Sequence, residues 1–147
     1  MSTAVSSLYR FAWRHVPALP PPVGYGLFRA GADAAWGLHR LGAGAAGVGQ
    51  LEKNLARVLP APTSLGRVRR ASRQAMRSYM RYFYEAFALA GMSEEQILAR
   101  VRADVPPQVH ADLQRDSIVL AVGHMGNWDL AGAWACRRLA TVLTVAE

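Results

Sequence analysis

Apolar side chains recur every three to four residues along most of the chain, and this spacing predicts helices. The longest periodic segment follows Thr63 and Ser64, which are both good helix N-caps, and ends before Gly91. We expect this long helix to carry a continuous core stripe on one face. The predicted helical segments are residues 5–16, 23–41, 51–59, 65–90, 93–101, 106–115 and 128–140.

Two segments near the end of the chain depart from the helical spacing. Residues 117–122 and 141–146 are short, apolar and rich in β-branched side chains, which is typical of buried strands. The order strand, helix, strand favours a right-handed βαβ unit with parallel strands. The sequence therefore predicts an α/β fold, in which N-terminal helices precede the start of a parallel sheet. Because two parallel strands cannot complete a sheet, we expect the chain to be an N-terminal piece of a longer enzyme.

The predicted elements divide the chain into two parts of one incomplete domain. Residues 1–62 hold the N-terminal helices, and residues 63–147 hold the long helix and the first part of the α/β core. Segment 5–16 is amphipathic, basic and aromatic, so it fits a helix on a membrane surface and equally a helix that covers a core. No apolar run approaches the roughly 20 residues that span a bilayer, and no signal-peptide order is present. We therefore expect a cytosolic chain that binds a membrane surface peripherally.

The charge balance favours anionic partners. The chain has 17 Lys and Arg against 10 Asp and Glu, and Lys53 is its single lysine. Arginine side chains match phosphate and carboxylate groups well, although an arginine-rich composition also follows from a GC-rich genome. Arginines recur at spacings of three and four along the long helix, and no acidic residue in that helix precedes Glu85. We expect this ridge to contact an anionic surface; its members are Arg70, Arg73, Arg77 and Arg81.

The candidate chemistry lies between the first predicted strand and the last helix. His124 and Asp129 are separated by a segment that contains Gly126, a residue that permits a tight turn. Asn127 is a good N-cap, which places Asp129 in the first helical turn. An imidazole held by a carboxylate is a general base fixed in one tautomer, and backbone N–H groups near Gly126 and Asn127 suit an oxyanion. The simpler alternative is that His124 is only a loop residue and Asp129 only a first-turn acid.

Other chemistries fit the sequence less well. Residues 42–47 spell G-x-G-x-x-G, but no strand precedes them and no acidic residue follows at the required distance, so we expect a linker. Cys136 is the single cysteine and cannot form an internal disulfide. The chain lacks the H-E-x-x-H, G-x-S-x-G and P-loop motifs, and we expect neither a metal site nor a resident cofactor. A basic nucleic-acid or membrane-binding module without catalysis remains an alternative, but we expect no nucleic-acid partner because zinc-ligand clusters and RRM motifs are absent.

A resemblance to a known family adds to this picture. The H-x4-D block from His124 to Asp129 resembles that of glycerolipid-type acyltransferases, and residues 121–129 are similar to the bacterial lipid A acyltransferase family. Many members of that family have Glu where this chain has Asp129, and Asp there resembles the actinobacterial phosphatidylinositol mannoside acyltransferases. Residues 54–60 also look like the N-L-x-x-x-x-P signature that precedes the catalytic block of the family.

The resemblance implies a membrane-associated acyltransferase with a sheet of the glycerolipid acyltransferase type. The implied donor is acyl-CoA, used as a co-substrate, or an acyl carrier protein. The implied acceptor is a mannosyl phosphatidylinositol, with a lipid A precursor as the alternative, on the cytoplasmic face of the cell membrane. In the predicted sheet, Glu147 follows the second strand and is expected to line the acceptor site, since the ends of parallel strands converge.

Overall fold

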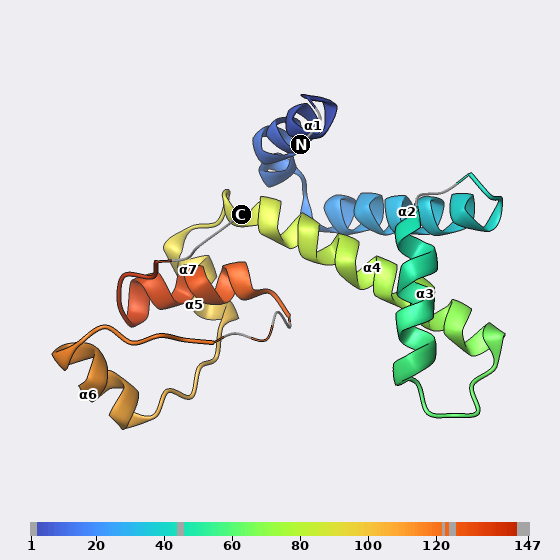
Figure 1. The fold of residues 1–147 in the computed structure, drawn as a ribbon. Helices are drawn as coiled ribbons and strands as arrows, with labels where there is room; N and C mark the ends of the chain where they lie inside the picture. Colours follow the sequence, from blue (N-terminus) through green and yellow to red (C-terminus); the bar gives the residue numbers. More distant parts are fainter. Residues whose placement is uncertain (1–2, 44–45, 122, 124–125, 144–147) are drawn as a thin grey trace.

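The computed structural model describes residues 3–43, 46–121, 123 and 126–143, and every regular element in these ranges is helical (Figure 1). Each segment that the periodicity predicts to be a helix is one, with ends that move by a few residues. The elements are α1 (Thr3–His15), the 3-10 turn η1 (Val16–Ala18), α2 (Pro21–Arg40), α3 (Ala46–Val58), α4 (Leu65–Leu89), α5 (Glu94–Arg100), α6 (Pro107–Arg115) and α7 (Trp128–Arg138).

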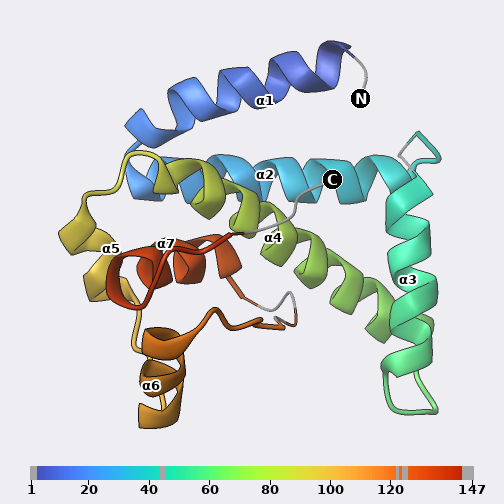
Figure 2. The ribbon, with the colours of Figure 1, turned by 60° about the vertical axis from the view of Figure 1, so that its left-hand side comes forward.

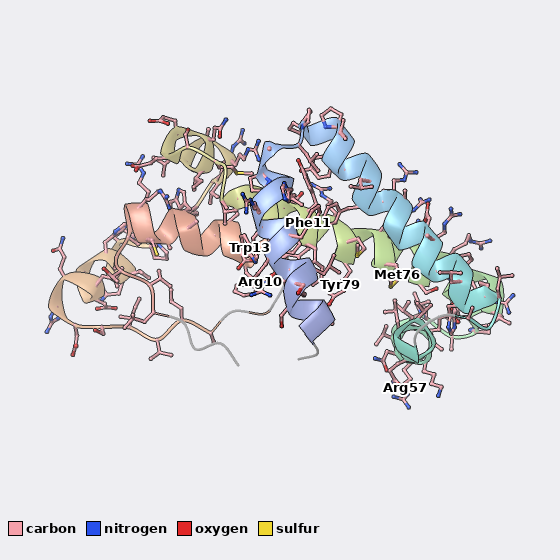
Figure 3. The ribbon with its side chains drawn as sticks, turned by 90° about the horizontal axis from the view of Figure 1, so that it is seen from above. Arg10, Phe11, Trp13, Arg57, Met76 and Tyr79 are labelled. Atoms are coloured by element: carbon pink, nitrogen blue, oxygen red, sulfur yellow. The ribbon has the colours of Figure 1, made fainter. Side chains whose placement is uncertain are left out.

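Helix α4 is the element against which the others are arranged. It lies alongside α2 along much of its length, while α3 crosses its N-terminal half (Figures 1 and 2). Helix α1 lies across the C-terminal half of α4, where Tyr9 and Trp13 meet Phe87 edge to face. Figure 3 shows this crossing from above, with Phe11 and Trp13 on α1. Helices α5 and α7 pack against each other, and α7 also contacts α4.

The apolar core lies where α1, η1, α2 and α4 meet. Tyr84 and Phe87 of α4 are only 3% and 6% exposed, and Phe28 of α2 packs against both rings. The approach of α2 to α4 is so close that a Cβ added to Gly24 would lie 2.1 Å from a Tyr84 ring carbon. Glycine at this position therefore lets the two helices touch.

Polar side chains connect the C-terminal half of α2 with the N-terminal half of α4. Trp36 of α2 donates from its indole Nε1 to the Ser72 hydroxyl over 2.9 Å, and Ser72 donates to Glu52 of α3 over 2.8 Å. Glu52 also forms an ion pair with Arg40. Ser72 is fully buried, so these partners satisfy a polar group that burial would otherwise penalise. The network ties α2, α3 and α4 together.

The predicted α/β fold is wrong, because the structure forms no strand among the described residues. Residues 117–121 are irregular and largely exposed, with Val119 at 99% exposure, and residues 141–143 are also irregular. A β-branched run favours extended backbone, but a strand exists only where a neighbouring strand pairs with its N–H and C=O groups. No described segment supplies such a neighbour, so residues 117–121 and 141–143 form no strand and no parallel βαβ unit. The remaining residues of the two predicted strands, 122 and 144–146, lie outside the described residues.

Candidate functional site

The start of α7 has the local structure that its sequence predicts. Gly126 has a positive φ of 71°, a conformation that glycine adopts without strain. Asn127 is the N-cap, and its Oδ1 accepts from the Leu130 backbone N–H over 2.9 Å. Asp129 therefore lies in the first turn of α7, where the helix dipole favours a carboxylate. His124 and Glu147 lie outside the described residues, so the predicted pairing of His124 with Asp129 stays a prediction.

The carboxylate of Asp129 is held by a tyrosine of α4. The Tyr82 hydroxyl donates to Asp129 Oδ2 over 2.7 Å, and both groups are part-buried. The Tyr82 ring also stacks on Trp128, with ring centroids 6.3 Å apart and planes inclined by 23°. Burial, followed by the hydrogen bond and the charge of Asp129, raises the pKa of Tyr82 to about 12. Tyr82 is thus a stable proton donor to this carboxylate at any physiological pH.

One turn further along α4, Glu85 holds the cap of α7. The Asn127 Nδ2 donates to Glu85 Oε2 over 3.2 Å. Glu85 Oε1 accepts from the Tyr25 hydroxyl of α2 over 3.1 Å and from Arg81 Nε over 2.7 Å. Glu85 therefore joins α2, α4 and the first residues of α7 through a single carboxylate.

Two cavities flank this junction, each of about 320 Å³. Asp129 lines the first, together with Trp13 of α1 and apolar residues of α4 and α5. Asn127 and Glu85 line the second. Leu89 and Met92 contribute to both cavities. The candidate site residues Asp129, Asn127 and Glu85 thus each line one of two cavities that share Leu89 and Met92.

Three of the four arginines in the predicted ridge form ion pairs, and two of these pairs are with an acid of α2. Asp33 of α2 accepts from Arg73 Nε over 2.9 Å and from Arg77 Nη2 over 2.6 Å. These hydrogen bonds, that of Arg77 first, hold the pKa of Asp33 well below its usual range. Arg81 pairs with Glu85 four residues later, and Arg70 is exposed. Much of the expected cationic ridge therefore belongs to ion pairs that join α2 and α4, and the expected contact with an anionic surface remains a prediction.

Sequence reasoning missed two members of the site, Tyr82 and Glu85. The Tyr82–Tyr84 cluster has the composition of a core segment, and Glu85 reads as a partner of the arginines. The sequence does contain one signal for this pair: Tyr82 and Glu85 are three positions apart, which places both side chains on one face of α4. Within the described ranges, no three or more His, Cys, Asp or Glu side chains gather where a metal ion would fit.

Comparison with known proteins gives the class of protein. The family model of the bacterial lipid A biosynthesis acyltransferases matches residues 1–147, and the chain belongs to that family. This result confirms the resemblance that the residues around His124 and Asp129 indicate. No solved structure matches the chain.

The curated relatives are more specific. The chain is 36% identical over 142 residues to a phosphatidylinositol mannoside acyltransferase of Mycolicibacterium smegmatis, covering 95% of this chain and 43% of the relative. It is 35% identical over 150 aligned positions to a protein of the same name from Mycobacterium tuberculosis, covering 99% of this chain and 44% of the relative. The chain thus spans a little under half of the length of these relatives.

Proposed function

We propose that the protein transfers a fatty acyl chain from acyl-CoA to a hydroxyl of a mannosyl phosphatidylinositol. Membership of the acyltransferase family supports the reaction class, and the names of the relatives support this acceptor. The observation that carries the proposal is the position of Asp129. It is fixed in the first turn of α7, held by Tyr82, and lines a cavity of about 320 Å³.

The proposed reaction uses His124 as the general base. His124 takes the proton of the acceptor hydroxyl while the oxygen attacks the thioester carbonyl, and Asp129 orients the imidazole and stabilises its charged form. Backbone N–H groups near Gly126 and Asn127 are suited to the oxyanion, because they lie at the N-terminus of α7. The C–S bond then breaks, and the imidazolium returns the proton to the leaving thiolate. In this proposal Glu147 lines the acceptor site.

The proposed location is the cytoplasmic face of the cell membrane, bound peripherally through α1. The part of α1 that faces α4 is buried at Ala12, while Leu8 and Phe11 are 65% and 61% exposed. Arg10 and Arg14 flank these apolar side chains and suit anionic headgroups. Among the helices of the described ranges, none is both long enough and apolar enough to cross a bilayer.

The experiment measures acyl-CoA consumption by the full-length protein with vesicles that contain a mannosyl phosphatidylinositol. His124→Ala is expected to lower kcat by about 10²–10⁴-fold, the usual contribution of a general base. His110→Ala, which changes an exposed histidine of α6, is the matched control and should leave the rate unchanged. A normal rate for His124→Ala would refute the mechanism. Faster turnover with a lipid A precursor would reassign the acceptor.

A further inference from the structure

We propose that Tyr82 and Glu85 are positioning residues that fix the Asp129 carboxylate by holding the first turn of α7. The inference rests on the proposed function, because it assigns these residues to the site that contains Asp129. It extends that function by placing part of the machinery on α4, more than forty residues earlier in the chain.

The first step of the argument is the direct contact with Asp129. A carboxylate in the first turn of a helix can rotate about its side-chain bonds, so the helix alone does not fix its direction. The Tyr82 hydroxyl donates to Oδ2 at 2.7 Å, an ordinary distance for an O–H···O hydrogen bond. The stacking of Tyr82 on Trp128 fixes the ring itself. The direction of the carboxylate is therefore set by α4.

The second step is the cap. Asn127 uses both ends of its amide, because Oδ1 accepts from Leu130 and Nδ2 donates to Glu85. The first bond fixes where α7 begins, and the second fixes where that beginning lies relative to α4. Glu85 is in turn held by Tyr25 and Arg81, so its carboxylate does not follow α7 if that helix shifts.

The third step is the scarcity of other anchors. No residue of α7 is fully buried, and in the part of the chain that the structure describes α7 packs mainly on α4 and α5. Its contact with α5 includes an ion pair of Arg137 with Glu94 at 3.9 Å, which lies at the far end of α7 from Asp129. The apolar residues of α7 are only partly buried, among them Leu130, Ala133 and Trp134, so packing locates this helix less firmly than it locates α4. Helix α7 lies beside α4 (Figures 1 and 2), and two hydrogen bonds and one ring stack from a single face of α4 therefore do most to place Asp129.

A double-mutant cycle between Tyr82 and Asp129 tests the inference in the full-length protein. Tyr82→Phe removes the donor and keeps the aromatic ring. Loss of a hydrogen bond to a charged group should lower kcat by about tenfold or more, with little change in KM for acyl-CoA. In an Asp129→Asn background the same substitution should change kcat by less than about twofold, because its effect acts through the carboxylate. A general structural role would lower kcat equally in both backgrounds.

Tyr79→Phe is the matched control for this cycle. Tyr79 lies one turn earlier on α4, is largely exposed, and makes no hydroxyl hydrogen bond within the described residues. It should leave kcat unchanged in both backgrounds. A normal rate for Tyr82→Phe, or an equal loss with and without the Asp129 carboxylate, would overturn the positioning role alone. A normal rate for Asp129→Asn would overturn both this role and the proposed function of Asp129.

Glu85 is tested by a graded pair of substitutions. Glu85→Gln keeps one side-chain acceptor oxygen where the carboxylate has two, and Glu85→Ala keeps none. We expect kcat to fall from wild type to Glu85→Gln and further to Glu85→Ala, and the decrease should shrink when Asp129 is Asn. Equal rates for all three proteins, or a loss that is the same in the Asp129→Asn background, would remove Glu85 from the positioning network.

Discussion

The helices before Gly91 and the segment after it are held in different ways. All described buried apolar side chains except Ile97 lie in residues 3–89, where aromatic rings interlock between α1, α2 and α4. In residues 94–143, α6 and α7 bury no residue, and the described residues between the helices form no regular element. The first region is located by packing, and the start of α7 is located mainly by two hydrogen bonds and one ring stack with α4.

The difference shows where each kind of change should act. Loss of packing volume in the first region should affect folding of the whole chain, because α4 contacts most of the other helices. Loss of a hydrogen bond at the start of α7 should affect the site while leaving the core intact. The bundle of α1 to α4 is thus the support, and the α4 face that carries Tyr82 is the point at which this support reaches the candidate chemistry.

The largest expected effect is truncation of the core. Phe87 is 6% exposed and contacts rings from α1 and α2, so Phe87→Ala should lower the free energy of unfolding by about 3–5 kcal/mol. Val119→Ala in the irregular segment 117–121 should change it by less than about 0.5 kcal/mol, because that side chain buries almost nothing. Denaturant unfolding of both variants measures the contrast. Similar losses for the two substitutions would contradict the division into two regions.

A smaller effect is expected where α2 touches α4. Gly24→Ala places a Cβ against the buried Tyr84 ring and should lower the free energy of unfolding by about 1–3 kcal/mol. Gly26→Ala lies two residues away in the same helix, with no atom near its added Cβ, and should raise stability by up to about 1 kcal/mol through helix propensity. Opposite shifts in Tm are expected, and shifts of the same sign would contradict the close α2–α4 approach.

The sequence predicts the helices well because their signals are local. The spacing of apolar residues defines α4, Ser64 caps it as expected, and Ser93 begins the predicted helix 93–101 with a capping box to Gln96. The Asn127 cap is also confirmed, because it depends on residues only three positions apart. Each of these caps depends on residues that lie within about one helical turn of each other in the sequence.

The features that failed or were missed depend on distant partners. Residues 117–121 have the composition of a strand, but pairing needs a second segment that local composition does not reveal. The acid that pairs with Arg73 and Arg77 is Asp33, which lies forty or more residues earlier on α2. Tyr82 and Glu85 likewise gain their roles from contacts more than forty positions away.

The smallest predicted effect concerns the ionisation of Tyr82. Its pKa in the folded protein is about 12, above the usual value of 10, because of burial and then Asp129. The sign follows from this direction: the stabilisation from the Tyr82 proton is fully present below about pH 10 and is lost as pH rises through about 12. A near-ultraviolet titration of wild type minus Tyr82→Phe should therefore show one tyrosine with a midpoint near 12. Asp129→Asn should lower that midpoint, since it removes the negative charge beside the hydroxyl. An unchanged midpoint in Asp129→Asn would show that Asp129 does not act on Tyr82. It would then contradict the hydrogen bond by which we expect α4 to hold the start of α7.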